Sequence, residues 1–221
     1  MNKLCYSILS LIYKENCEIC SKVTNENTYI CKSCINKILE KSVGKTRNLL
    51  NTYDIIYVSR YSILKKYIIK YKFNSKKYIG NMFIALCVER LKKYLNKIDI
   101  ITSVPLSKEK KKKRGYNQSE YVAKKVAEKC NIKYVNFLYK NKNNINQSSL
   151  NKQERKENIK GIFSLENEII LNKEKYENKN ILLLDDVYTT GVTIDECIKI
   201  IKEKVNCNII VLIIAINNNK I

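Results

Sequence analysis

The sequence predicts an α/β protein, a parallel sheet flanked by helices, with a small cysteine-rich unit in front of it. Apolar runs at residues 181–184 and 207–216, the second interrupted only by Asn208, support the sheet, because nearly continuous apolar runs are typical of strands buried on both faces. The second run is too short to cross a membrane as a helix and suits a central strand. Two Cys-x-x-Cys pairs define the cysteine-rich unit. We therefore assign residues 1–50 to an N-terminal unit and residues 51–221 to the α/β domain.

The composition restricts the classes of function. The chain has 221 residues, 45% of them hydrophobic, and a net charge of +21, which suits one domain with a small appendage and a polyanionic partner. The chain is also rich in Lys, Asn, Ile and Tyr, the bias of an A/T-rich coding sequence, so part of the lysine content need not reflect function. It has no histidine, which excludes a histidine base and a histidine metal ligand.

Four of the nine cysteines form two pairs, Cys17 with Cys20 and Cys31 with Cys34. Each pair can direct two thiolates at one ion, and together they complete a tetrahedral site with four sulfur ligands. We expect structural zinc, which would supply much of the folding free energy of so small a unit, in a reducing compartment such as the cytoplasm. A thioredoxin-like redox site would need only one pair and a βαβ context. The remaining cysteines are predicted to be core residues: Cys5, Cys87, Cys130, Cys197 and Cys207.

The apolar stretch at residues 4–13 has two interpretations. It resembles a weak signal-peptide core, but no small-residue cleavage site follows, and it is too short to span a bilayer. Leu4, Ile8 and Leu11 fall on one helical face. We therefore expect a short helix packed on the body of the protein, and no membrane insertion.

A basic, tyrosine-rich stretch follows a strand predicted at residues 53–59. Leu64, Ile68 and Tyr71 share one helical face, with lysines largely on the other side. Such a helix can bind single-stranded DNA by pairing with phosphates and stacking on bases, or it is an ordinary amphipathic helix whose tyrosines pack inward. The basic residues and tyrosines concerned are Arg60, Lys65, Lys66, Lys70, Lys72, Lys76, Lys77, Tyr61, Tyr67, Tyr71 and Tyr78.

The apolar run at residues 181–184 leads into the most informative segment of the chain. Two aspartates stand at the predicted carboxyl end of this strand, where ligands bind in open α/β sheets, and they can accept hydrogen bonds from neighbouring sugar hydroxyls. The next loop enters a helix expected over residues 194–204 and directs free N–H groups and hydroxyl donors at an anion. The segment predicts a ribose 5-phosphate pocket, although an ordinary strand–turn–helix is the alternative. The pocket residues are Asp185, Asp186, Val187, Thr189, Thr190, Gly191, Val192 and Thr193.

This segment resembles the phosphoribosyl-pyrophosphate (PRPP) motif of the type I phosphoribosyltransferases. The hydrophobic run, the acidic pair and Thr-Thr-Gly-x-Thr follow one another without a gap. A Walker P-loop would end in Gly-Lys-Ser/Thr, which is missing here. The resemblance implies the type I phosphoribosyltransferase fold, PRPP as the ligand, magnesium bound mostly with PRPP, and pyrophosphate as the leaving group.

A second strand end supplies candidates for holding the pyrophosphate. The strand expected at residues 99–106 contains the only proline, and residues 108–114 are almost all basic. Alone, such a run is usually a solvated loop or a nucleic-acid contact, but cations and N–H donors beside a PRPP pocket can hold pyrophosphate. A helix should continue to about residue 130. The predicted pyrophosphate site comprises Pro105, Lys113, Arg114, Gly115, Asn117 and Gln118, and the candidate catalytic residues are Arg114, Asp185 and Asp186.

A narrower resemblance, to the ComF family, covers nearly the whole chain. It rests on Val104-Pro-Leu106, Arg114-Gly-Tyr-Asn-Gln118, Gly161-x-Phe163 and the PRPP motif, in that order after the cysteine pairs. The ComF family joins a four-cysteine zinc knuckle to a phosphoribosyltransferase domain and is associated with natural competence, the uptake of transforming DNA. The resemblance implies PRPP, single-stranded DNA and competence-machinery proteins such as a DNA helicase as partners. The chain departs from the pattern at residues 141–146, which are rich in asparagine.

Three functions are compatible with the sequence. The protein can transfer a phosphoribosyl group to a nitrogen nucleophile, bind PRPP or single-stranded DNA without turnover, or use the fold to sense a regulatory ligand. We expect the hood that covers the acceptor to comprise residues 139–178 and the helix near Tyr61. Gln147, Arg155 and Asn158 are its predicted pocket contacts, or else plain helix surface.

Overall fold

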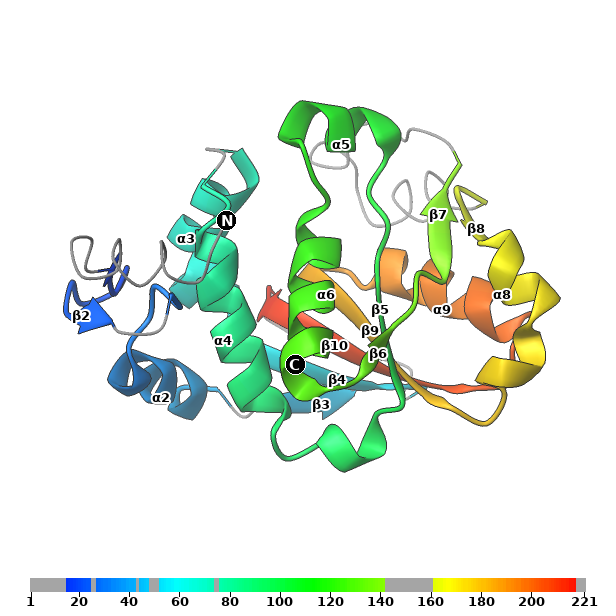
Figure 1. Ribbon diagram of the computed structural model, residues 1–221, viewed down its shortest axis with the longest axis horizontal. Coiled ribbons are helices and arrows are strands. Elements are labelled where there is room, and N and C mark those ends of the chain that lie inside the picture. Colours follow the sequence, from blue (N-terminus) through cyan, green and yellow to red (C-terminus); the bar gives the residue numbers. More distant parts are fainter. Residues whose placement is uncertain are drawn as a thin grey trace, which may run out of the picture.

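A computed structural model describes residues 15–24, 27–42, 44–47, 52–73, 76–141 and 161–217 (Figure 1). The helix expected over residues 4–13 and the hood contacts Gln147, Arg155 and Asn158 lie outside these ranges. Within them, no helix is long and apolar enough to cross a membrane.

A mixed six-stranded sheet forms the centre of the protein (Figure 1). In spatial order its strands are β3 (Lys45–Arg47), β4 (Asp54–Arg60), β10 (Asn208–Ile216), β9 (Asn180–Tyr188), β5 (Ile100–Ser103) and β6 (Lys133–Tyr134). Neighbouring strands from β4 to β6 are parallel, and β3 adds an antiparallel edge next to β4. The predicted α/β class is confirmed, and the two apolar runs form β9 and β10 in the middle of the sheet.

Helices cover both faces of the sheet (Figure 1). They are α2 (Lys32–Glu40), α3 (Tyr61–Phe73), α4 (Ile79–Leu91), α6 (Gln118–Cys130), α8 (Asn167–Leu171) and α9 (Val192–Lys202), with short 3-10 helices at Leu95–Lys97 and Lys173–Tyr176. A further helix, α5 (Lys108–Arg114), buries no residue and stands apart from the sheet (Figure 1). Two small antiparallel sheets complete the described structure: β1 (Glu15–Asn16) with β2 (Val23–Thr24), and β7 (Leu138–Lys140) with β8 (Phe163–Leu165).

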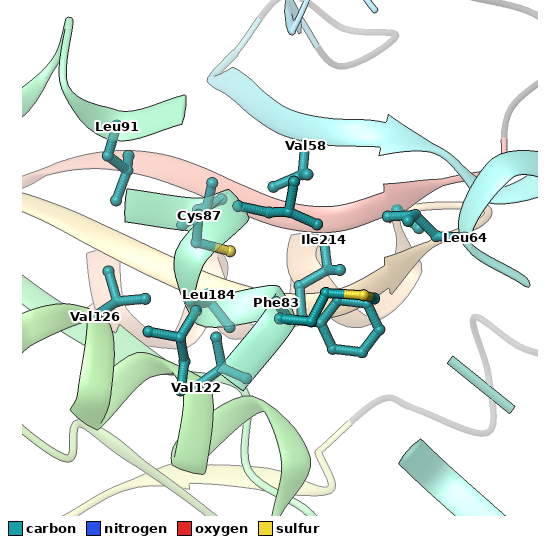
Figure 2. Packing of buried hydrophobic residues seen from close by; sticks show 14 of the residues in the cluster. Val58, Leu64, Phe83, Cys87, Leu91, Val122, Val126, Leu184 and Ile214 are labelled. Atoms are coloured by element: carbon teal, nitrogen blue, oxygen red, sulfur yellow. The ribbon is translucent and has the colours of Figure 1, made fainter. Parts of the chain in front are cut away.

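Alternating side chains along β9 divide the core into two layers. Leu184 packs in the layer formed with α3, α4 and α6, whereas Leu183 packs in the layer formed with α9. Successive strand residues point to opposite faces, so a strand covered on both sides needs an unbroken apolar run. Figure 2 shows the first layer, where Leu184 and Ile214 of the sheet lie beside Phe83 of α4 and Val122 of α6.

The N-terminal unit packs into the first of these layers. Cys34 and Ile38 of α2 belong to the same buried cluster as the sheet residues. Arg90 of α4 donates from Nη2 to the carbonyl oxygens of Leu39 and Val58, both at 3.0 Å, which joins α2 to β4. The cysteine-rich unit therefore shares a hydrophobic core with the α/β domain.

α3 confirms the predicted amphipathic helix. Leu64, Tyr67, Ile68 and Tyr71 are buried along one side of it. Since Tyr67 and Tyr71 are only 3% and 1% exposed, stacking of DNA bases on these two tyrosines is excluded.

Three local expectations differ from the structure. The helix expected to continue to residue 130 is split into α5 and α6 at Gly115, which has a φ of 80°. β5 ends at Ser103 rather than near residue 106, in keeping with Pro105, which has no N–H to donate to a neighbouring strand. The helix expected over residues 194–204 is α9, which runs from Val192 to Lys202.

Candidate functional site

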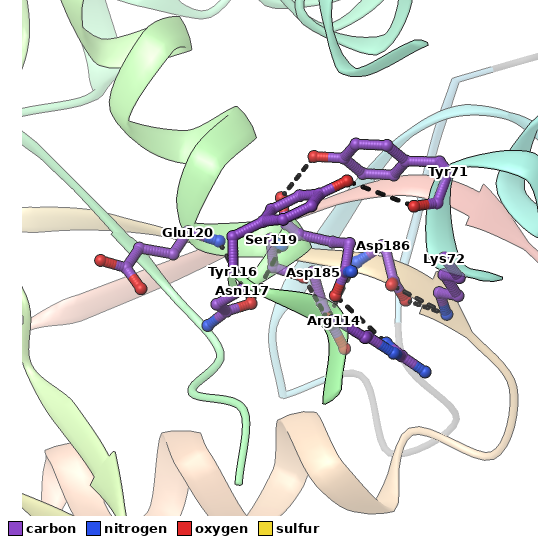
Figure 3. A network of polar contacts seen from close by, with 10 residues as sticks. Tyr71, Lys72, Arg114, Tyr116, Asn117, Ser119, Glu120, Asp185 and Asp186 are labelled. Atoms are coloured by element: carbon purple, nitrogen blue, oxygen red, sulfur yellow. Dashed lines mark hydrogen bonds and ion pairs between the residues drawn. The ribbon is translucent and has the colours of Figure 1, made fainter. Parts of the chain in front are cut away.

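The acidic pair lies at the carboxyl edge of the sheet, where β9 extends beyond β5, which pairs with it only as far as Leu184. Asp185 Oδ1 accepts hydrogen bonds from Ser119 Oγ and from the backbone N–H of Asp186, both at 2.9 Å. Both carboxylate oxygens of Asp186 contact Lys72 Nζ, at 2.9 and 2.8 Å (Figure 3). One aspartate is thus held by neutral donors and the other by a cation.

The surroundings of Asp185 raise the pKa of its carboxyl group. Burial raises the pKa of Asp185 to about 7, and the negative charge of Asp186 adds to the rise. The Asp186 amide, the charge of Lys72 and the Ser119 hydroxyl act in the opposite direction. Asp185 consequently exchanges its proton near neutral pH, whereas an ordinary aspartate is fully ionised there.

The loop after β9 presents unpaired amides beside the acidic pair. Gly191 is the N-cap of α9 and has a φ of 80°, and the Tyr188 hydroxyl fills the place that a Cβ atom would take. Among the described residues, no hydrogen-bond acceptor faces the backbone N–H groups of residues 189–193, as expected where a helix begins. Of the predicted pocket residues here, Thr189 is exposed, Val187, Thr190 and Thr193 are half-buried, and Val192 is buried.

The basic segment forms α5, which ends at Gly115 in the left-handed conformation and turns the chain back towards the sheet. Arg114 Nη1 donates to Gln118 Oε1 at 3.1 Å (Figure 3). Lys113 is exposed, as are most of the other α5 lysines. Arg114 therefore lies against α6, while Lys113 extends into solvent.

The side-chain amides of Asn117 and Gln118, at the start of α6, differ in whether their N–H groups already have hydrogen-bond partners. Asn117 Oδ1 caps α6 by accepting two backbone N–H groups, and Nδ2 donates to the Val104 carbonyl next to the half-buried Pro105. The Asn117 side chain is thus largely engaged within the fold, which leaves only the second N–H of Nδ2 to donate to pyrophosphate. Gln118 is 2% exposed, and its Nε2 has no hydrogen-bond partner in the described structure. A buried donor without a partner costs about 1–3 kcal/mol, and a ligand would satisfy it.

The structure brings three more lysines to this region. Lys72 comes from α3, Lys110 from α5 and Lys140 from β7. Burial lowers the pKa of Lys110, and the nearby charges of Arg114 and Lys72 lower it further. Burial also lowers the pKa of Lys140 to about 8, with Lys110 contributing. Cations that are partly desolvated and repel one another favour binding of a multiply charged anion.

The four predicted metal-binding cysteines converge in the N-terminal unit. The Sγ atoms of Cys17, Cys20, Cys31 and Cys34 all lie within 4.8 Å of one another, and those of Cys20 and Cys31 are 3.6 Å apart. A tetrahedral ion with metal–sulfur bonds of about 2.3 Å separates its ligands by roughly 3.8 Å, so the cluster fits one metal ion. Burial acts to raise the pKa of Cys17, but backbone hydrogen bonds lower it to about 7.

Fold and site together define a class of protein: an α/β domain with an acidic pair and an amide-lined loop at one sheet edge. Residues 87–220 match the family described as the phosphoribosyl transferase domain, and the chain belongs to this family. The match begins inside α4, so the cysteine cluster and α3 lie outside it. Membership of this family implies a substrate of the PRPP type.

Relatives confirm the narrower resemblance seen in the sequence. Competence protein ComFC of Streptococcus pneumoniae is 29% identical over 199 residues, which cover 90% of this chain and 80% of that protein. Competence protein ComFC of Bacillus subtilis is 26% identical over 209 residues, which cover 91% of this chain and 79% of that protein. A crystal structure of adenine phosphoribosyltransferase from Thermoanaerobacter pseudethanolicus aligns with a TM-score of 0.37 and 13% identity, over 81% of this chain and 98% of that chain.

Proposed function

We propose that this protein binds PRPP at the carboxyl edge of its sheet and acts in DNA uptake during competence, the process for which its relatives are named. The observation that carries the PRPP proposal is the combination at one edge of the acidic pair with a loop of unpaired amides. Asp185 and Asp186 would accept hydrogen bonds from the ribose hydroxyls, and the backbone N–H groups of residues 189–193 would bind the 5-phosphate.

The neighbouring cations suit the other end of PRPP. Arg114 would contact the pyrophosphate, and Lys110, which is close enough for the charge of Arg114 to lower its pKa, would add a second positive charge. The unpartnered Nε2 of Gln118 supplies a buried donor for a phosphate oxygen. Magnesium, bound mostly with PRPP, would neutralise part of the pyrophosphate charge.

Two uses of this site remain in competition. In a transferase, a nucleophile would displace pyrophosphate from C1 of the ribose, and Arg114 would stabilise the charge that develops on the leaving group. In a binding protein, the same residues would hold PRPP without turnover. A screen for pyrophosphate release from PRPP, with candidate bases and nucleic acids as acceptors, decides between them.

The experiment that tests PRPP binding is a thermal-stability measurement. At concentrations far above its dissociation constant, PRPP with magnesium should raise the melting temperature by roughly 5 °C or more, because a ligand of the folded state stabilises by mass action. The double substitution Asp185→Asn with Asp186→Asn should abolish this rise. Asp54→Asn, at the amino end of β4, removes a charge at the opposite edge and should leave it intact. A wild-type protein that does not respond to PRPP would contradict the proposal.

A second candidate function is binding of single-stranded DNA, favoured by the exposed lysines of α5. Lys111, Lys112 and Lys113 are all exposed at the site edge, where they can pair with phosphates along a nucleic-acid backbone. Changing all three to glutamine should weaken oligonucleotide binding and reduce the slope of log affinity against log salt by about 2 to 3 units.

A charge-matched control separates this surface from the general basicity of the chain. Lys173, Lys175 and Lys179 are also exposed and lie near the amino end of β9. Their replacement by glutamine removes the same charge far from α5. Equal effects of the two triple substitutions, or an affinity that does not depend on salt, would contradict a DNA site on α5.

A further inference from the structure

α3 contacts both the cysteine cluster and the candidate PRPP site, although it lies outside the matched family domain. Near the cysteines, it meets Glu18, which stands inside the first Cys-x-x-Cys pair. Lys70 Nζ lies 3.2 Å from Glu18 Oε2, and Tyr67 donates to the Glu18 carbonyl oxygen at 3.2 Å. Tyr78, just before α4, donates to Glu18 Oε1 at 2.8 Å. A metal ion bound to Cys17 and Cys20 would therefore restrict the motion of Glu18, and Glu18 in turn binds α3 through Lys70 and Tyr67.

The last turn of α3 reaches the other site. The Tyr71 hydroxyl donates to the Gln118 carbonyl at 3.1 Å, and the Tyr116 hydroxyl donates to the Tyr71 carbonyl at 3.2 Å (Figure 3). These contacts fix the helix end against the start of α6. Lys72 then extends to Asp186 and binds both of its carboxylate oxygens (Figure 3).

Lys72 supplies a positive charge beside the acidic pair, and no residue of the PRPP motif does so. Two adjacent carboxylates at a partly buried edge repel each other, and PRPP adds further negative charges beside them. Lys72 and Asp186 have side chains only 19% and 15% exposed, so solvent screens their attraction less than at an open surface. The ammonium group therefore orients Asp186 and offsets its charge at the place where the ribose hydroxyls would bind.

We propose that Lys72 is a positioning residue of the PRPP site. The cysteine cluster, with its metal bound, sets the position of Lys72 through Glu18 and α3. This inference rests on the proposed PRPP function. PRPP affinity should then depend on metal in the cysteine cluster, although the cluster itself need not touch PRPP.

Calorimetric titration of PRPP with magnesium tests the role of Lys72. Lys72→Met should weaken PRPP binding about tenfold or more, the loss expected when one partner of a half-buried ion pair at the site is removed. Lys72→Arg keeps the charge and the donors, and should restore most of the affinity. Lys65→Met, an exposed lysine of the same helix, should bind PRPP like the wild type. Equal affinities of Lys72→Met and wild type would refute the proposal.

The link to the metal is tested by combining metal removal with the Lys72 substitution. Chelation of the metal from the folded wild-type chain should weaken PRPP binding, whereas it should have little further effect on Lys72→Met, because the same contact is then already lost. Glu18→Gln, which keeps all four thiols, should retain the metal and yet weaken binding in the same direction. If metal removal weakens both proteins equally, the coupling does not run through Lys72.

Hydrogen exchange gives a reading that does not depend on PRPP. Metal removal should speed amide exchange in α3 more than in α9, because the buried residues of α3 share a hydrophobic cluster with Cys17 and Cys34 and those of α9 belong to the other cluster. Unchanged exchange in α3 would overturn the connection while leaving PRPP binding intact. A wild-type protein that binds no PRPP would instead overturn the proposed function, and with it the role assigned to Lys72.

Discussion

At the scale of single residues, neighbours in sequence have different chemistry because their partners differ. Asp185 accepts hydrogen bonds from a serine hydroxyl and an amide, while Asp186 faces the ammonium group of Lys72. The motif specifies two carboxylates, and the surrounding elements decide which of them is neutralised by a cation. A pair of this kind can respond to pH close to neutrality.

Asp185→Asn should stabilise the protein above pH 7. The folded-state pKa of about 7 exceeds the unfolded value of about 3.9, so the folded protein binds this proton more tightly and loses stability as the pH rises between the two values. Asparagine keeps an acceptor for Ser119 and removes that loss. The difference in free energy of unfolding between Asp185→Asn and the wild type should therefore grow by about 1 kcal/mol in favour of the variant between pH 6 and pH 8, measured by urea unfolding. An advantage that does not change with pH would contradict the raised pKa.

At the scale of elements, two glycines set the helix ends that form the site. Gly115 ends α5 and Gly191 begins α9, each with a φ of 80°. This left-handed conformation costs other residues about 1–2 kcal/mol. Only Gly191 is also crowded, by the Tyr188 hydroxyl, whereas nothing lies within 4 Å of a Cβ atom at Gly115. An alanine at Gly115 therefore measures the cost of the left-handed conformation alone, whereas an alanine at Gly191 adds the cost of steric overlap with Tyr188.

Gly115→Ala should lower the free energy of unfolding by about 1–2 kcal/mol and should reduce the thermal shift by PRPP only in part, because no atom lies within 4 Å of the added Cβ. Gly191→Ala should cost more and should also abolish the thermal shift by PRPP, because the new methyl group displaces Tyr188 or moves the amides of the loop. Thermal unfolding with and without PRPP measures both effects. Equal losses for the two variants would show that the Tyr188 contact is not important.

At the scale of the whole molecule, the cysteine-rich unit and the α/β domain share one hydrophobic core. Cys17 and Cys34 lie in the same buried cluster as Leu184 and Ile214 of the sheet. Arg90 ties α2 to β4 through backbone carbonyls, and β3 extends the main sheet from the N-terminal side. Loss of order in the knuckle would therefore expose part of the central core.

We propose zinc as the metal, and elemental analysis should find about one ion per chain. Cys31→Ser should lose it, while Cys130→Ser, outside the cluster and half-buried, should retain it. Metal removal should lower the melting temperature of the entire chain in one transition, because the core is shared. Two separate transitions would indicate that the knuckle and the domain unfold independently.

The sequence alone determined the features that are local in the chain. The apolar runs of β9 and β10, the acidic pair with its glycine-containing loop, and the cysteine pairs each depend on residues a few positions apart, so hydrophobic pattern and ligand spacing suffice to predict them. α3 was also predicted from its periodic apolar face, and the burial of Tyr67 and Tyr71 excludes these two tyrosines as stacking surfaces for DNA bases.

Only the tertiary structure decided which distant residues join the site. Lys72 and Asp186 are far apart in the chain, and their ion pair depends on how α3 packs against α4, β4 and β10, which no local pattern encodes. The same holds for Lys110 and Lys140, and for Asn117, whose amide is engaged by α6 and the Val104 carbonyl. Local propensities specify elements, whereas the charges and donors that surround a bound anion are set by the packing between them.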